Sequence, residues 1–435
     1  MIKFISTIIL TSIIIGQESS REIGLGGVMV TLSRGVEAVG VNPANLGFSN
    51  PSISLLNFNT SIYNNLLSLE VYNNINGADL ENPNSPLTKT ELFDILNGNS
   101  FDLFNQLNLN IPGINYSNNK YALSTRLRQI TELKTGNGLF KTLLFGNEWE
   151  TEIPIEFEAN LQTVIEYAIS SWFKLDGFSI GYTLKYLQGV NLFKLYSLPD
   201  NKPLYTDSTG IDMSFYLGRE LYPGGSGLGI DVGIATEESN SGFSIGLSIV
   251  NIFGYINWDK HNLNYSLFGK QLIENSDLSA FKTEVVGLEI NNLNASDLMS
   301  GTIELADSVF SDSTFTQNLE TPILKTDYPS ILRFGLSKKF DDNYYLAYES
   351  RTGFQDNSVK PVDWVHSIGV EIIRWKIIPL RFGLSSGDKF NHKFSFGSGI
   401  HINPIKFDFG IAWIGSRKIY TANGLEFGMS FTLGF

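Results

Sequence analysis

The sequence contains no cysteine among its 435 residues. A chain without cysteine has no disulfide framework, no thiolate metal site, no cysteine nucleophile and no lipoprotein acyl anchor. Positive charge is also scarce, because 31 lysines and arginines stand against 44 aspartates and glutamates, for a net charge of −13. Nucleic-acid binding requires basic surface that neutralises phosphates, so we expect no nucleic-acid partner.

Long apolar runs are absent after the first 16 residues. The segment "MIKFISTIILTSIIIG" (residues 1–16) carries one positive charge, Lys3, ahead of an apolar run from Phe4 to Ile15. That run is too short for a membrane helix and has the length found in a secretory signal peptide; the alternative is a buried N-terminal strand. We expect a signal peptide at residues 1–16, and an exported protein that is either a soluble β protein or an outer-membrane barrel.

A strict alternation of residue types ends the sequence. In "LEFGMSFTLGF" (residues 425–435) every odd-numbered residue is large and apolar, and every even-numbered residue is small or polar. Alternation with period two is typical of a β-strand with one apolar face. The pattern recurs upstream in residues 178–186, 211–217, 228–234, 243–249, 332–337, 364–372, 378–385, 393–402 and 405–413.

The two faces of these strands differ in a way that indicates a membrane barrel. The polar face consists of glycine, serine, alanine and occasional charges, whereas the apolar face carries bulky Phe, Trp, Leu and Ile, which suits lipid outside and a polar interior. The joins alternate between short (374–376, 402–404) and longer (352–362, 416–422), as periplasmic turns and extracellular loops do. We predict an all-β fold: a transmembrane antiparallel β-barrel of about 14 strands (14–16) over residues 51–435, in a bacterial outer membrane.

Two segments have the spacing of helices. In residues 85–107 and 137–146 apolar side chains recur every three or four positions, so we predict short helical insertions there. A strand pair at about 108–131 separates them, which places both at the same rim of the barrel. Residues from about 270 to 327 are acidic and rich in Ser and Asn, and we expect a long loop.

A glycine-rich segment lies between the expected signal peptide and the first strand. It contains "SRGVEAVGVNPANLG" (residues 33–47) and is too irregular for a barrel strand. The segment resembles the start of FadL-like outer-membrane proteins, which carry a comparable "NPA" element, and is more similar to an uncharacterised FadL-like and PorV-like group common in Bacteroidota. The resemblance implies a secreted β-barrel, with 14 strands and passage of hydrophobic molecules in FadL itself, and an N-terminal plug, here residues 21–50.

The resemblance also implies candidate gating residues in the plug: Arg34, Glu37, Asn42, Pro43 and Ala44. Proline would stiffen a turn there, and asparagine would cap backbone groups. The alternative is a turn that leads into the first strand without a gating role.

We expect no enzyme, metal site or cofactor. None of the four histidines is spaced with another ligand as in zinc sites, and Ser398 falls on the opposite strand face from His401, its nearest base. Charged residues fall on the presumed inner faces, where we expect mainly structural ion pairs. They are Glu166, Lys185, Asp212, Asp231, Arg333, Glu371, Arg381 and Asp408.

The sequence thus predicts passive uptake of a hydrophobic or amphipathic small molecule past the plug. Capture would fall to the two helical insertions, through Leu92, Leu96, Leu143 and Leu144. The alternative is a PorV-like component that acts by contact with secretion-system proteins. Outer-membrane lipid and the barrel-assembly machinery are further expected partners, the latter reading Phe431, Leu433 and the terminal Phe435.

Overall fold

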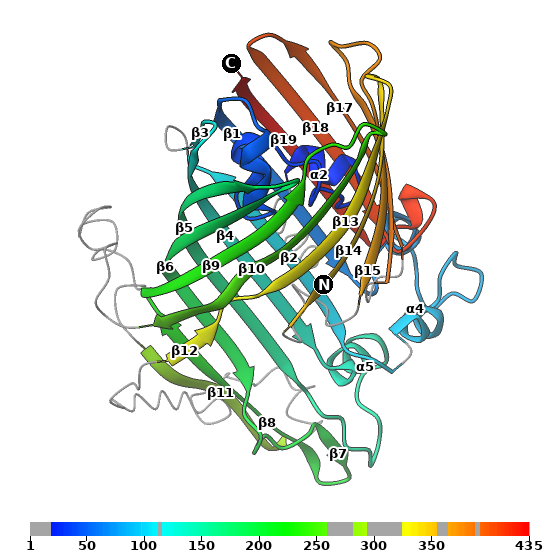
Figure 1. Ribbon diagram of the computed structural model, residues 1–435. Helices are drawn as coiled ribbons and strands as arrows, with labels where there is room; N and C mark the ends of the chain where they lie inside the picture. Colours follow the sequence, from blue (N-terminus) through cyan, green and yellow to red (C-terminus); the bar gives the residue numbers. More distant parts are fainter. Residues whose placement is uncertain are drawn as a thin grey trace.

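The chain folds into one antiparallel sheet that closes on itself (Figure 1). The computed structural model describes residues 19–96, 98–111, 115–258, 282–293, 324–354, 364–387 and 392–434. The ring closes because β1 (Ser52–Asn64) pairs with both β2 (Phe101–Asn110) and β19 (Gly424–Gly434). The predicted signal peptide and Phe435 lie outside the described residues.

The ring contains 14 strands, as predicted. Three of the ring strands are interrupted, and each of these carries two labels. They are β2 with β3, which both pair with β4; β8 with β9, which both pair with β6; and β12 with β13, which both pair with β10. The remaining bounds are β3 (Tyr116–Ser117), β4 (Tyr121–Thr135), β5 (Phe157–Leu175), β6 (Phe178–Ser197), β7 (Tyr205–Asp207), β8 (Gly210–Tyr222), β9 (Gly225–Thr236), β10 (Phe243–Trp258), β11 (Lys282–Leu293), β12 (Leu324–Asp327), β13 (Ile331–Phe340), β14 (Tyr344–Gly353), β15 (Val365–Ile372), β16 (Leu380–Ser386), β17 (His392–Ile402) and β18 (Ile405–Ile414).

The outer face of the ring is apolar and the inner face is polar. In β9, Leu228, Ile230 and Ile234 are exposed, whereas Asp231 on the opposite face is completely buried. A sheet with bulky apolar residues outside and polar groups inside is stable where lipid surrounds it. The protein is therefore a bacterial outer-membrane β-barrel. None of the helices in the described residues is long and apolar enough to cross a membrane.

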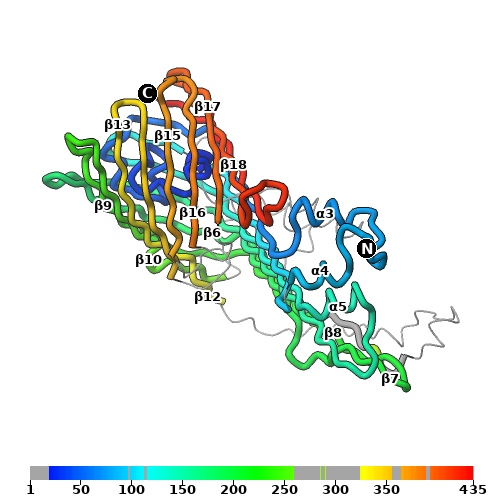
Figure 2. Tube along the Cα trace, turned by 90° about the vertical axis from the view of Figure 1, so that its right-hand side faces the viewer, coloured from blue at the N-terminus to red at the C-terminus, as the bar shows by residue number. Residues whose placement is uncertain are grey.

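Short turns gather at one rim and longer connections at the other. The short rim includes 341–343 and 403–404, while the long rim includes 65–100 and 136–156. The helices α3 (Leu69–Ile75), α4 (Lys89–Leu96) and α5 (Asn137–Phe145) lie together at the long rim (Figure 2). The prediction that both helical insertions share one rim is confirmed, since α4 and α5 are in contact.

The first helical insertion is shorter than predicted. Helix α4 ends at Leu96, and residues 101–107, predicted as helix, belong to β2. Leu103 and Phe104 have helical spacing to Leu96, but their backbone groups find hydrogen-bonding partners in both β1 and β4. A segment between two strands satisfies its backbone in the sheet, and this outweighs local spacing.

The predicted loop at about 270–327 is also partly wrong. Residues 282–293 form β11, which pairs with β8, and residues 324–327 form β12. Figure 1 places β7, β8 and β11 together beyond the ring, so the wall extends past the barrel at this side. The rest of that range lies outside the described residues.

Candidate functional site

The barrel interior holds the first described part of the chain, residues 19–50, here called the N-terminal segment (Figure 1). It consists of α2 (Ser20–Gly24) and two 3-10 turns, η1 (Gly35–Ala38) and η2 (Pro43–Phe48). Helix α2 begins where the Ser19 side chain accepts a hydrogen bond from the Glu22 amide, a standard N-terminal cap. The predicted plug, residues 21–50, falls within this segment; its closing role stays a prediction.

The segment packs against wall glycines that leave no room for a side chain. A β-carbon on Gly383 would lie 2.2 Å from the Gly26 nitrogen, and one on Gly181 would lie 2.1 Å from the Ala44 nitrogen. These distances are far inside van der Waals contact, so only glycine permits such close approach. The wall glycines whose β-carbon would lie less than 3.0 Å from an atom of the segment are Gly181, Gly233, Gly246, Gly335, Gly369, Gly383, Gly397, Gly410 and Gly428.

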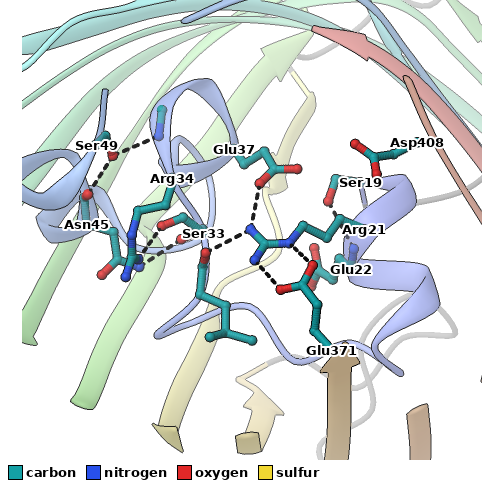
Figure 3. Close-up of polar contacts among 12 residues, drawn as sticks. Ser19, Arg21, Glu22, Ser33, Arg34, Glu37, Asn45, Ser49, Glu371 and Asp408 are labelled. Carbon is teal, nitrogen blue, oxygen red and sulfur yellow. Dashed lines mark hydrogen bonds and ion pairs between the residues drawn. The ribbon is translucent and has the colours of Figure 1, made fainter. Parts of the chain in front are cut away.

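Ion pairs also join the segment to the wall. Arg21 donates from Nη2 to Glu371 Oε2 at 2.7 Å and lies 3.4 Å from Glu37, which belongs to η1 (Figure 3). Glu371 is shared with Arg381 of β16, at 2.8 Å, and Arg381 in turn contacts Asp408 at 2.6 Å. Each charge in this buried cluster has an opposite partner, as stable burial of charge requires. The expectation that inner-face charges form ion pairs is confirmed for Glu371, Arg381 and Asp408.

A second set of contacts holds the segment on β13 and β14. Glu22 accepts from Arg333 at 2.6 Å, and Glu349 Oε2 accepts from the backbone amides of Met29 and Val30 at 2.7 and 2.8 Å. All of these groups are nearly inaccessible to solvent. The segment is therefore fixed by both shape and charge.

Inner-face pairs elsewhere also follow the prediction. Lys185 lies 2.9 Å from Asp231, and Glu166 lies 3.4 Å from Arg128. Asp212 sits on β8 beside Tyr205 of β7, in the part of the wall beyond the ring.

A cavity of about 590 Å³ lies between the N-terminal segment and the wall, bordered by β1, β2 and β4 and also by β13 and β15 to β19. Its wall carries amide and guanidinium groups, namely those of Asn57, Asn59, Asn108, Asn110, Arg126 and Arg128. The charged residues that line it are Arg21, Arg34, Arg126, Arg128, Arg333, Arg381, Lys406, Glu22, Glu37, Glu371 and Asp408. This part of the lumen is therefore strongly polar.

Two predicted gating residues line this cavity. Arg34 donates to the carbonyls of Thr31 and Ser33 at 2.9 and 2.7 Å, and its guanidinium lies over the Phe48 ring. Burial and the neighbouring Arg21 lower the pKa of Arg34 to about 10. Burial raises the pKa of Glu37, and the charge of Arg21 opposes that rise.

The other three gating candidates lie away from the cavity. Asn42 caps η2 by accepting from the Ala44 amide, and it donates to the carbonyls of Val30 and Ile234. Pro43 and Ala44 follow it, buried against the wall glycines of β6 and β9. These residues fix the segment to the wall.

An apolar cluster fills another part of the barrel interior. Its members are Val164, Leu187, Leu192, Tyr222, Ile256, Trp258 and Tyr328. Tyr328 donates to Glu166 and lies beneath the guanidinium of Arg128, so the cluster borders the polar network. The described interior thus has a polar and an apolar region.

The predicted capture residues are mostly covered. Leu92, Leu96 and Leu144 are buried together with Leu66 in a cluster that joins the rim helices, and only Leu143 is exposed. The rim instead exposes a set of apolar side chains that the sequence analysis mostly missed: Leu69, Ile95, Leu143, Phe145 and Trp149. Residues on the outer side of a short amphipathic helix could have been found from its periodicity.

The predicted assembly residues lie at the seam of the barrel. Phe431 is paired with Leu56 of β1 and Phe407 of β18, and Leu433 with Ile53 and Ile405. Their role in assembly stays a prediction.

Sequence reasoning missed Arg21, Glu22 and Arg126. Arg21 and Glu22 pair with wall residues more than 300 positions away, and nothing in the sequence around Arg126 indicates that it lines a cavity. The described residues contain no group of three His, Asp or Glu side chains that could hold a metal.

Solved structures with a similar fold include two toluene transporters. The toluene transporter TbuX of Ralstonia pickettii is 12% identical, with a TM-score of 0.51 over 96% of this chain and 98% of its own. The P. putida toluene transporter TodX is 10% identical, with a TM-score of 0.50 over 96% and 98%. At these identities the likeness is one of fold, and it supports the FadL-like part of the resemblance at that level. The PorV-like part stays a prediction.

No curated protein matches the chain. A family model matches residues 192–413, which is slightly more than half of the chain and runs from the end of β6 to β18. The chain therefore belongs to the family of unknown function DUF5723.

Proposed function

We propose that this barrel admits a hydrophobic or amphipathic small molecule across the outer membrane, with the N-terminal segment as a plug beside the path. The observation that carries the proposal is the exposed apolar surface of the rim helices and of the residues that follow α5. Leu69, Leu143 and Trp149 are 51%, 47% and 61% exposed. Apolar side chains at the entrance of a channel are exposed to water at a cost in free energy. Binding of an apolar molecule would cover them and remove that cost.

Two further observations support the proposal. The lumen contains a buried apolar cluster beyond the rim, around Trp258 and Tyr328, so the interior is not polar throughout. TbuX and TodX, which share the fold, are toluene transporters by name. Uptake would be passive, driven by the concentration gradient of the molecule.

Uptake of a hydrophobic fluorescent probe, 1-N-phenylnaphthylamine, by cells that express the barrel tests the proposal. Leu143→Asp and Leu69→Asp should lower the initial rate several-fold, because a charge removes the apolar contact and attracts water. Asn73→Asp is the matched control, since it adds the same charge to an exposed position of α3 without loss of apolar surface.

Surface levels of the folded barrel must be equal in all variants, as judged by heat-dependent gel mobility. Unchanged probe uptake in both leucine variants would contradict the proposal. If those variants instead lost a co-purifying secretion-system protein, the rim would be a docking surface of the PorV-like kind.

A further inference from the structure

The cavity beside the N-terminal segment borders a part of the described wall where long polar side chains take the place of the close-packed glycines. Wall glycines meet the segment on β6, β9 and β10 and from β13 through β19, except β14. On β1, β2 and β4 the wall carries Asn59, Asn108, Asn110 and Arg126 instead. These side chains border the cavity, although the segment still touches β4 through the hydrogen bond from Arg126 to the Val39 carbonyl.

The cavity contains cations that lack an acidic partner. Its carboxylates are all engaged: Glu371 and Asp408 by Arg381, Glu22 by Arg333, and Glu37 by Arg21. In the described part of the chain, by contrast, Arg34, Arg126 and Lys406 form no ion pair. Among the residues that line the cavity seven are cationic and four are carboxylates, and this excess of positive charge favours a positive potential there.

Polar atoms at the cavity are also without hydrogen-bond partners. The Arg126 Nε atom is buried and unpaired among the described residues, as are Asn59 Oδ1 and Asn110 Oδ1. Arg126 makes one hydrogen bond, from Nη2 to the Val39 carbonyl at 3.3 Å, which leaves most of its donors free. Buried polar groups are costly unless they are paired, so this part of the wall has hydrogen-bonding capacity that the described residues do not satisfy.

We infer that this cavity binds a small, water-soluble organic anion that bears a carboxylate or phosphate group. The guanidinium groups of Arg126 and Arg34 would receive the anionic group, because an arginine fork matches the oxygens of such groups. The asparagine amides of β1 and β2 would pair with hydroxyl or carbonyl groups of the same molecule. A volume of about 590 Å³ is in the range of small-molecule sites. The site is separate from the rim, so it goes beyond the proposed uptake of hydrophobic molecules.

Isothermal titration of the detergent-solubilised full chain with succinate and with succinamide tests the inference. The two probes have nearly the same size, and only succinate is charged. At constant ionic strength the wild-type protein should bind succinate at least about 10-fold more tightly than succinamide, the factor expected for a charge-assisted pair. Arg126→Gln should weaken succinate binding by about 10-fold or more, and Arg126→Lys should restore part of it.

The matched control is Lys418→Gln, which removes one positive charge at a position outside the cavity, where the ammonium lies over the Tyr420 ring. It should leave succinate binding unchanged. Equal binding of the two probes, no binding of succinate, or an equal loss in the Lys418 variant would overturn the inference. If Arg126→Gln does not fold, the wild-type comparison of the two probes and the Arg34→Gln variant decide it. Failure here leaves the probe-uptake experiment unaffected.

Discussion

A β-carbon on Gly233 would lie 2.0 Å from the Oδ1 atom of Asn42, so the asparagine side chain occupies the space that any larger residue at position 233 would need. Gly233→Val should therefore push the turn at residues 42–44 off the wall, while the outer face of β9 stays intact. Overpacking of this kind costs about 1–3 kcal/mol.

The displacement can be measured by labelling, since the chain has no native cysteine. Ala44→Cys, at a fully buried position, should react with a maleimide much faster in the Gly233→Val background. Gly229→Val is the matched control, because its β-carbon would meet nothing closer than 3.5 Å. Equal labelling in the two backgrounds would show that the turn is not held by this contact.

Arg381→Met should destabilise the barrel by about 3–5 kcal/mol, because it leaves two buried carboxylates without their shared partner. The Arg381 side chain is 1% exposed and contacts both Glu371 and Asp408. Lys174→Met, which breaks an exposed pair with Glu237, should cost at most about 1 kcal/mol. Urea unfolding in lipid vesicles gives both values, and similar losses in the two variants would contradict the assigned role of the interior pairs.

Leu96→Ala should loosen the rim helices, while Leu143→Ala should not. Leu96 is 2% exposed in the cluster that joins α4 to α5, so its truncation leaves a cavity worth about 2–5 kcal/mol. Leu143 points to the surface, so Leu143→Ala should lower the free energy of unfolding by less than about 1 kcal/mol. Hydrogen exchange of the amides in 89–96 and 137–145 should speed up in the first variant alone. Protection kept in the Leu96 variant would mean that this cluster does not hold the helices together.

Deletion of Phe435 should lower the amount of folded barrel in the outer membrane several-fold, because the predicted assembly signal loses its terminal aromatic. Thr432→Ser is the control on the same strand, where the side chain lines the interior cavity. The fraction that keeps its compact gel mobility without heating reports folding. A normal folded fraction without Phe435 would remove this residue from the assembly signal.

The barrel itself could be predicted because its information is local. Alternation within β9 or β19 assigns each residue to lipid or lumen, and the turn lengths order the rims. The interior could not be predicted in this way. Arg21 and Glu371 are 350 positions apart, and nothing in either neighbourhood indicates the other. Helix α4 was overextended for the same reason, since the strand at Leu103 depends on partners in β1 and β4.

The N-terminal segment has a consequence for the order of events in time. It precedes β1 in the chain, yet it touches strands up to β19, and the β1–β19 pairing is the last join of the ring. A folded segment this closely fitted to wall glycines cannot pass between paired strands. It must therefore already lie among the strands when β1 meets β19, or enter afterwards through a rim in unfolded form. In the first case the newly made chain folds around its own N-terminal segment, and β19 completes an enclosure whose contents were synthesised before any strand of the barrel.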